Sequence, residues 1–407
     1  MSNQNVTSSK KLTIIRVIYE PIPGVGGSIR HTVDLYMHID PYIKMQYLIN
    51  PVLKTGETDH SINGMNILRP YKKSKLLTRS LLKFIDLWMF AEKSIIYANL
   101  LQQQLRELTI VHVHGLLLGL YMVLLKKLIG VNMPIIIMVH GGYTKRDHKI
   151  GFSYNLQKLL MLMVHPDAYV LLNDGSDIDD MIGKIKKNIP YTVVYHAIDT
   201  NEFHKVICHK ADRPFRILFP HRLVAVKSPE IALHVINELI CRIMQDDKIE
   251  KPRLEFVFLA PSGYNNEIKK LQIEDYVIYA GFQTPEGMLS EYNKADVVIG
   301  TSLSSNMGRA TQEAMACETT VVTFQSGHME TLIEDKVDGY LVQPGDVKGM
   351  SNILYWAYHN RKKLEETGKN ARCKIMKERS WDKRVNTELG VYDEIVRANK
   401  NKGAIKP

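Results

Sequence analysis

Runs of β-branched and aliphatic residues alternate along this chain with segments of helical periodicity. Continuous apolar runs of this kind are typical of strands that are buried on both faces of a parallel sheet. The alternation therefore predicts an α/β protein. The runs predicted as strands are LTIIRVIY (12–19), LTIVHVHG (108–115), PIIIMVHGG (134–142), DAYVLLN (167–173), YTVVYHA (191–197), FRILFPHRL (215–223), RLEFVFLA (253–260), DYVIYAG (275–281), ADVVIG (295–300) and TTVVTF (319–324).

The alternation is interrupted once, between Asp199 and Pro214, where charge is mixed and no periodicity is present. We predict two Rossmann-like domains, residues 1–205 and 206–385, followed by a C-terminal helix and tail at 386–407. Ligands of such folds bind outside the carboxyl ends of the strands. The residues that follow each strand are therefore the candidates for function.

Composition and charge narrow the class of protein. A hydrophobic content of 45% with 24% charged residues is the profile of a folded protein, and the net charge of +10 suggests an anionic partner without saying which. The longest apolar run, LLLGLYMVLL (116–125), is too short to cross a bilayer and predicts a buried helix. Four cysteines without paired or metal-ligand spacing, and an N-terminus without a signal-peptide apolar region, lead us to expect a cytoplasmic protein.

In the first domain, glycines and histidines follow the predicted strands. Gly26 and Gly27 precede a helical segment, so they are candidates to bring backbone N–H groups close to an anion, although plain turn geometry explains them equally well. His140 ends a strand beside two glycines, and we expect it to be functional. His112 and His114 point to one face of a strand, but no carboxylate or cysteine accompanies them at metal-ligand spacing.

In the second domain, two cations flank a turn between a strand and a helix that Pro229 would start. Arg222 offers a planar fork and Lys227 a point charge, a combination suited to a diphosphate. Two solvated surface charges would look the same in the sequence.

A loop and a helix follow the strand ADVVIG, with the sequence TSLSSNMGRATQEAMA (301–316). Glu313 lies about one turn into this helix, where a carboxylate accepts hydrogen bonds from a vicinal diol such as a ribose. Backbone N–H groups near Asn306, Met307 and Gly308 would meet phosphate or sugar oxygens. An acidic first turn without any ligand is the alternative.

In order and spacing, these motifs resemble the family-4 retaining glycosyltransferases of the GT-B fold (glycosyl transferases group 1), over nearly the whole chain. The resemblance implies two Rossmann-like domains that face each other across a cleft, with a C-terminal helix returning to the first. It implies catalytic roles for His140, Arg222 and Lys227, and donor binding by Gly26, Gly27, Ser305, Asn306, Met307, Gly308 and Glu313. The segment SGHMETLIEDKVDGYLVQPGD (326–346), with Glu330, is similar to the closing motif of the family.

The chain departs from the family pattern at one acidic position. Ser305 stands where the family usually has a glutamate, and Asn306, Met307 and Arg309 replace other common residues. A serine still hydrogen-bonds a sugar hydroxyl, so we expect transfer to persist and Ser305→Glu to change donor choice or raise turnover. A nucleotide-sugar-binding pseudoenzyme and a GT-B-like epimerase are the two alternatives.

The resemblance implies retaining transfer of a sugar from a nucleotide-diphosphate donor to a glycan or lipid-linked acceptor, without nucleic acid, cofactor or metal. An Asp-x-Asp pattern at Asp177 and Asp179 is more typical of a helix start than of a metal site. In the stretch 69–90, six basic residues precede the first acid, Asp86, and Ile85 and Trp88 belong to a predicted apolar stripe. We expect this stretch to contact an anionic membrane surface, whereas an ordinary surface helix is the alternative.

Overall fold

The computed structural model describes residues 12–19, 27–51, 65–68, 82–140, 151–175, 182–183, 185–206, 213–305 and 307–401. Its contacts divide the chain into two compact units. Unit 1 comprises residues 1–173, 177–195 and 382–407, and unit 2 comprises 174–176 and 196–381. The junctions therefore lie at 195/196 and 381/382, whereas the sequence predicted them at 205/206 and 385/386. Residues 196–205 belong with unit 2 because Ile198 bridges to Ser380, and Arg372 donates to the carbonyls of Thr200 and Phe203.

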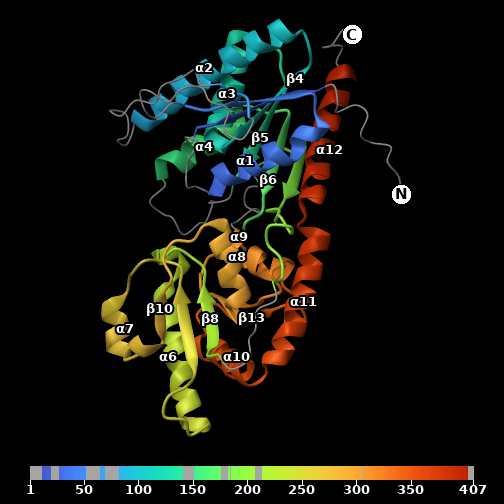
Figure 1. Ribbon diagram of the computed structural model, residues 1–407. Helices are drawn as coiled ribbons and strands as arrows, with labels where there is room; N and C mark the ends of the chain where they lie inside the picture. The colour runs from blue at the N-terminus through green and yellow to red at the C-terminus, as the bar shows by residue number, and fades with distance from the viewer. Residues whose placement is uncertain are drawn as a thin grey trace. The chain divides into compact units, whose positions relative to one another are not determined.

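Unit 1 is built on a seven-stranded parallel sheet in the order β3-β2-β1-β4-β5-β6-β7 (Figure 1). This is the Rossmann arrangement, in which the strand order reverses between β1 and β4. Its strands are β1 Thr13–Ile18, β2 Met45–Ile49, β3 Ile67–Leu68, β4 Thr109–His114, β5 Ile135–Val139, β6 Ala168–Leu172 and β7 Tyr191–Val194. Its helices are α1 Gly27–Ile39, η2 Asp40–Tyr42, α2 Leu82–Leu105, α3 Leu116–Ile129 and α4 Gly151–Met163, and most of α12 Trp381–Asn401 belongs to it.

Unit 2 repeats the plan with a six-stranded parallel sheet in the order β10-β9-β8-β11-β12-β13. The order reverses between β8 and β11. Its strands are β8 Phe215–Phe219, β9 Leu254–Phe258, β10 Val277–Tyr279, β11 Val297–Gly300, β12 Thr320–Phe324 and β13 Tyr340–Val342. Its helices are η5 Ala225–Lys227, α6 Pro229–Asp246, α7 Asn265–Leu271, η6 Glu274–Tyr276, α8 Pro285–Lys294, α9 Arg309–Ala316, η7 Met329–Thr331, α10 Val347–His359 and α11 Arg361–Glu378.

All ten strands predicted from apolar runs are present, and the prediction of a parallel α/β fold is confirmed. LLLGLYMVLL forms the buried part of α3, and α6 begins at Pro229, both as predicted. The sequence missed β2, β3 and β13. Two of these have only two or three residues, too few to show an apolar run.

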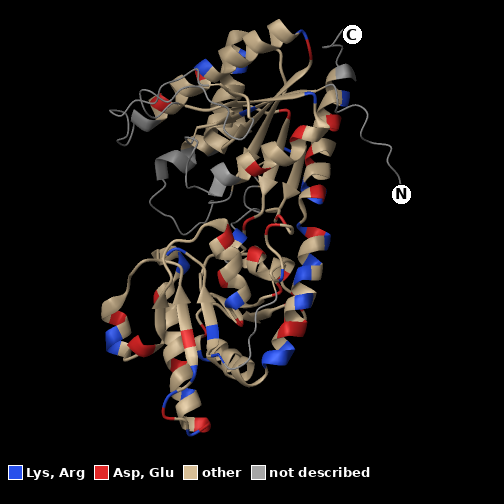
Figure 2. Cartoon of the chain, in the orientation of Figure 1, with Lys and Arg blue, Asp and Glu red and all other residues tan. Residues whose placement is uncertain are grey.

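Charged residues are rare in the strands and more frequent on the helices (Figure 2). In the described strands, the only lysine, arginine, aspartate or glutamate residues are Arg16, Arg216 and Glu255. Arg216 is neutralised locally, because it pairs with Glu255 at 2.5 Å and with Glu291 at 2.7 Å. Arg16 is fully buried in β1 and needs partners from elsewhere in unit 1. Among the described cysteines, Cys241, Cys317 and Cys373 are free thiols.

Candidate active site

The two cations predicted in the second domain lie at the point where the strand order of unit 2 reverses. Arg222 and Lys227 follow the carboxyl end of β8, and the loop 301–308 follows its neighbour β11. This is the position at which open α/β sheets bind ligands. Unit 2 therefore brings the cations and the loop together, as the sequence predicted.

Lys227 is the more buried of the two cations, and Arg222 is exposed. Burial lowers the pKa of Lys227; Asp174 opposes that shift, and Arg222 adds to it. The Lys227 ammonium donates to the carbonyl of Ser305 at 3.4 Å. Arg222 and Lys227 lie close enough for the charge of Arg222 to lower the pKa of Lys227, so an arriving anion would meet two neighbouring cations.

Hydroxyl groups fix the loop that follows β11. Thr301 Oγ1 donates to the carbonyl of Ser228 at 2.9 Å, and Ser302 Oγ donates to that of Val226 at 2.8 Å. Ser326 Oγ in turn donates to the carbonyl of Ser302 at 2.7 Å. These bonds hold the loop against the turn that carries Lys227.

Ser305 is part of this scaffold. Its Oγ donates to the carbonyl of Asp174 at 2.6 Å and accepts from the backbone N–H of Met307 at 3.3 Å. Gly175 (φ +83°) and Gly327 (φ +66°) lie against it so closely that a Cβ on either glycine would overlap its side chain. The hydroxyl that the sequence assigned to the donor sugar is thus engaged within unit 2, on the side that faces Gly175 and Gly327.

The remaining donor-binding candidates of unit 2 have different environments. Met307 is buried in the core, and its carbonyl accepts from Gln312 at 3.0 Å. Gly308 caps α9, and a Cβ there would meet nothing within 4 Å, so this backbone is open to approach. Asn306 lies outside the described residues.

Glu313 is buried, and both of its carboxylate oxygens are occupied. Oε2 accepts from the Tyr292 hydroxyl at 3.1 Å, and Oε1 accepts from Arg309 Nε at 3.3 Å. Each carboxylate oxygen has two lone pairs, so a further hydrogen bond from a diol stays chemically available. Its role as a ribose ligand remains a prediction, and Arg309 is the group with which a ribose would compete.

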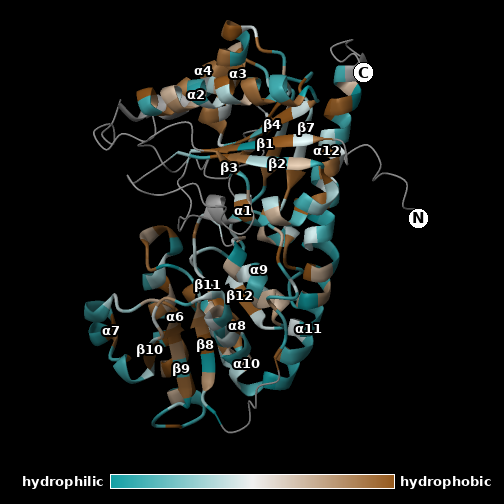
Figure 3. Cartoon of the chain, turned by 45° about the horizontal axis from the view of Figure 1, so that its top comes forward, coloured by the Kyte–Doolittle hydropathy of each residue, from teal (hydrophilic) through white to brown (hydrophobic). Residues whose placement is uncertain are grey.

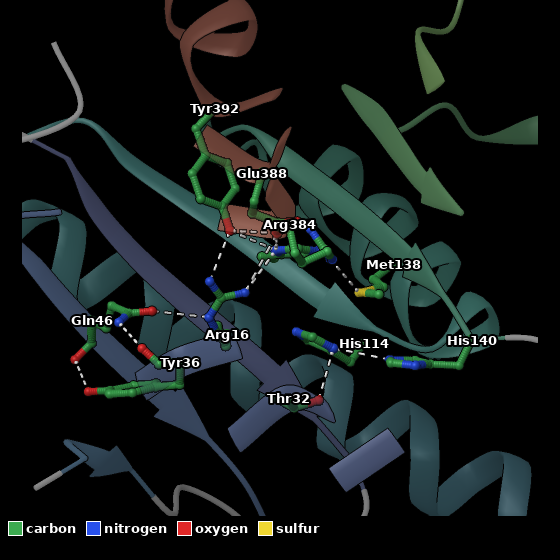
Figure 4. Close-up of polar contacts among 11 residues, drawn as sticks. Arg16, Thr32, Tyr36, Gln46, His114, Met138, His140, Arg384, Glu388 and Tyr392 are labelled. Atoms are coloured by element: carbon green, nitrogen blue, oxygen red, sulfur yellow. Dashed lines mark hydrogen bonds and ion pairs between the residues drawn. The ribbon is translucent and has the colours of Figure 1, made fainter. Parts of the chain in front are cut away.

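In unit 1, His140 lies at the end of a row of histidine rings (Figure 4). It follows β5 directly, and its Nε2 lies 3.1 Å from Nδ1 of His114. The rings of His112 and His114 stack at 4.9 Å, those of His114 and His140 at 5.3 Å, and His31 contacts His140 edge-on at 5.6 Å. His112 and His114 do share one strand face, as predicted, and within the described part of the chain no group of three or more His, Cys, Asp or Glu residues is placed to hold a metal.

Behind the histidines lies a charged network that sequence reasoning missed. Glu388 accepts from His112 Nδ1 at 2.8 Å and from the Tyr392 hydroxyl at 2.9 Å, and it pairs with Arg384. Arg16 donates to the Tyr392 hydroxyl at 3.1 Å and lies 3.8 Å from Glu388. No local pattern links β1 with α12, and an arginine inside an apolar strand was the one available signal.

Three predicted features cannot be placed. Gly26 and the Asp-x-Asp pair lie outside the described residues, and Gly27 is placed only as the first residue of α1. Sequence reasoning also missed His221, which is buried one residue before Arg222 and contacts Phe219 edge-on at 5.2 Å. Burial, with the charge of Lys227, lowers its pKa to about 3, so it is neutral at physiological pH.

Comparison with known proteins identifies the family. Residues 200–374, which include the cation pair and the loop 301–308, match the family model described as "Glycosyl transferases group 1". Over this region the chain is therefore similar to the group 1 glycosyltransferases. It is thereby a transferase, as the sequence motifs predicted.

Named glycosyltransferases are among its relatives. The chain is 23% identical to the N-acetyl-alpha-D-glucosaminyl L-malate synthase of Bacillus anthracis over 73% of its own length and 78% of that protein. It is 28% identical to the D-inositol 3-phosphate glycosyltransferase of Salinispora tropica, over 46% of its own length and 39% of that protein.

Solved structures identify the fold of this glycosyltransferase as GT-B. It matches sucrose-phosphate synthase from Thermosynechococcus elongatus with a TM-score of 0.76 at 14% identity, over 95% of this chain and all of that one (100%). It matches HepE from Anabaena, solved with UDP and glucose, with a TM-score of 0.70 at 15% identity, over 94% of this chain and 99% of that one.

Proposed function

We propose that this glycosyltransferase moves a sugar, with retention of anomeric configuration, from a nucleoside-diphosphate sugar to a glycan or lipid-linked acceptor. The observation that carries the proposal is the pair Arg222 and Lys227 at the strand-order reversal of unit 2, beside the loop that follows β11. HepE, which shares the fold, has been solved with UDP and with UDP-glucose.

A diphosphate suits this pair on chemical grounds. It would supply the negative charge that a half-buried ammonium lacks, and the guanidinium fork of Arg222 matches two phosphate oxygens. The N-terminus of α9, with open backbone at Gly308, adds N–H groups and the positive end of the helix dipole. These groups would stabilise the charge that develops on the leaving diphosphate. We also propose a catalytic role for His140.

Calorimetric titration with UDP tests the donor site. Lys227→Ala and Arg222→Ala should each weaken binding by about 1.5–3 kcal/mol, the range for hydrogen bonds to charged groups. That corresponds to a roughly ten- to hundred-fold higher Kd. The matched control is Lys251→Ala, an exposed lysine paired with Asp275, which should leave affinity unchanged. Unchanged affinity in both site variants would contradict the phosphate assignment.

The stereochemical part of the proposal has its own readout. The coupling constant of the anomeric proton in the product, measured by NMR with UDP-glucose as donor, should show the same anomer as the donor. The opposite anomer would contradict retention and leave the phosphate site untouched.

We also propose that unit 1 contacts an anionic membrane surface through α2 and α4. None of the helices in the described ranges is long and apolar enough to cross a membrane. Both helices pack against α3, and Figure 3 shows hydrophobic positions along all three. The large apolar side chains that remain exposed on α2 and α4 are Ile85, Met89, Ile96, Tyr97, Leu100, Leu159, Leu162 and Met163.

The exposed face of α2 differs from the sequence prediction. Ile85 and Trp88 were predicted to share one apolar stripe, but Ile85 is 50% exposed while Trp88 packs against the core of unit 1. Asp86 is buried between them, where it accepts from the Tyr19 hydroxyl. The stripe turned out wrong because that hydrogen bond allows an acid to face the core. The basic residues of 69–81 lie outside the described residues, and their sequence directly before α2 favours an anionic partner.

Co-sedimentation with phosphatidylglycerol vesicles tests this contact. The double variant Ile96→Gln/Leu100→Gln should bind several-fold less protein, because apolar burial at the interface is lost. Phe282→Gln, which removes an exposed aromatic of unit 2, is the control and should bind normally. Equal binding by both variants, or no binding at low salt, would favour a soluble acceptor.

A further inference from the structure

We propose that His112 and His114, anchored on Glu388, position His140 as a neutral imidazole that carries its proton on Nδ1. In this form His140 is a hydrogen-bond donor through Nδ1 and is no general base. The inference rests on the proposed function only where it gives the Nδ1–H group of His140 a role in sugar transfer. The tautomer itself is a property of unit 1.

Glu388, His112, His114 and His140 form an array of polar side chains. It begins at Glu388, a carboxylate that can only accept hydrogen bonds. Burial works to raise the pKa of Glu388, but the charge of Arg384, the hydrogen-bonded His112 and Arg16 hold it well below its usual range. An ionised carboxylate has no proton to donate. His112 Nδ1 lies 2.8 Å from Glu388 Oε1, 2.9 Å from the Tyr392 hydroxyl and 3.1 Å from Arg16 Nη1, which can only donate. Because Glu388 is the one ionised acceptor at Nδ1 and His112 Nε2 has no acceptor, the proton of His112 belongs on Nδ1 and points at Glu388. His112 Nε2, which is buried and unpartnered, is then an empty acceptor, which costs less than a buried N–H without a partner.

The same reasoning fixes the second ring. His114 Nδ1 lies 3.0 Å from Thr32 Oγ1 and 3.1 Å from His140 Nε2, whereas its Nε2 is buried without a partner (Figure 4). A proton on Nε2 would have no acceptor, so the proton belongs on Nδ1. His114 then donates from Nδ1 toward His140 Nε2. His140 must accept there, which leaves its own proton on Nδ1.

Burial and the surrounding charges favour the neutral forms of His112 and His114. Arg16 on β1, Arg384 on α12 and His31 on α1 surround the row, and Glu388 is the one acid of the described network. Burial lowers the pKa of His112, although Glu388 opposes the shift. Burial lowers the pKa of His114 much further, with His112, His140, Arg16 and His31 adding to the effect. Stacking of the three rings restrains their orientation as well.

Histidine-selective ¹⁵N labelling of the full chain, read by long-range ¹H–¹⁵N correlation between pH 5 and 8, tests the proposal. His140→Gln identifies the signals of His140. The expected wild-type result is a protonated Nδ1 and an unprotonated, hydrogen-bonded Nε2 at His140 throughout the neutral range. A protonated Nε2 at His140 in the wild type would overturn the proposal without any variant.

Two substitutions at His114 separate positioning from packing. His114→Phe keeps the ring stack but removes the donor, so His140 should lose the fixed Nδ1 tautomer. His114→Asn places an amide N–H near the Nδ1 position and should retain it. The exposed His234→Asn, in unit 2, should change nothing at His140. An unchanged His140 spectrum in His114→Phe would overturn the proposal.

Whether His140 takes part in transfer is measured separately, by enzyme turnover. If the tautomer is as expected but His140→Gln leaves UDP-glucose turnover unchanged, the array stands and His140 is not the catalytic residue. If His140 is catalytic as a donor, His114→Phe should lower kcat more than it raises KM. The lower kcat of His114→Phe should not recover at higher pH. Recovery would be expected if His140 were a general base whose pKa the substitution had raised.

Discussion

Both units combine a parallel sheet with a group of polar side chains, but the interactions that hold these side chains differ. Unit 1 uses ionised and aromatic side chains that come from β1, β4 and α12 and meet in its interior. Unit 2 uses hydroxyls of the loop after β11, which donate to the backbone carbonyls of Val226, Ser228 and Asp174, with Lys227 as a partly buried cation beside them. The first design fixes the orientation of side chains, whereas the second fixes the course of a loop.

The largest effect that distinguishes the two designs is expected at Glu388. Glu388→Ala leaves the buried charges of Arg16 and Arg384 without their acid, and removing one partner of a buried pair costs about 3–5 kcal/mol. Urea denaturation should show that loss in the free energy of unfolding. Glu394→Ala, an exposed acid on the same helix, should stay within about 0.5 kcal/mol of the wild type. Equal stability of the two variants would mean that the network does not hold α12 in unit 1.

A smaller effect is expected in the loop of unit 2. Ser305→Glu restores the residue common in the family, yet its side chain would be forced against Gly175, Gly327 and the carbonyl of Asp174. Overpacking of this kind costs about 1–3 kcal/mol. Ser305→Ala only loses hydrogen bonds and should cost about 0.5–1.5 kcal/mol.

The relative stability of Ser305→Glu and Ser305→Ala tests how tightly the loop of unit 2 is held. The expectation drawn from the sequence was that glutamate at 305 would change donor choice or raise turnover. If the glutamate variant proves as stable as the wild type and turns over faster, the loop of unit 2 is less tightly fixed than its contacts indicate.

The third effect concerns pH and is spread over several pH units. His221 has a pKa of about 3 when folded and about 6.5 when unfolded, so between these values the unfolded state binds more protons. Stability should therefore fall as the pH falls from about 6.5 toward 3, by up to about 1.4 kcal/mol per pH unit for this group. His221→Phe should flatten that slope, as measured by urea denaturation across the range. The exposed His234→Phe serves as the control, and a slope that stays unchanged in His221→Phe would contradict the prediction.

The same contrast explains what the sequence could reveal. The loop site of unit 2 was predicted because Thr301 to Glu313 are contiguous, and Arg222 and Lys227 sit a few residues after one strand. The strands were predicted because each is a short apolar run. Arg16, His112, Glu388 and Tyr392 come together only after the chain has folded across its full length, and no local pattern reports such a meeting.

Side-chain surroundings were the other limit. Ser305 was correctly identified as a departure from the family pattern. Its acceptor, the carbonyl of Asp174, lies 131 residues away in sequence, next to Gly175, and Gly327 follows a different strand. Burial of Asp86 likewise depends on Tyr19, a residue of another element. Sequence periodicity reports only whether each residue is polar or apolar, and carries no information on a distant hydrogen-bond partner.

The central claim, that a nucleoside diphosphate binds at the strand-order reversal of unit 2, is tested most directly by hydrogen–deuterium exchange with and without UDP or GDP. We expect slower exchange in residues 222–228 and 301–316 of the wild type, and loss of that protection in Lys227→Ala at the same nucleotide concentration. Protection confined to other segments, or protection of these two that persists undiminished without the lysine, would contradict the account.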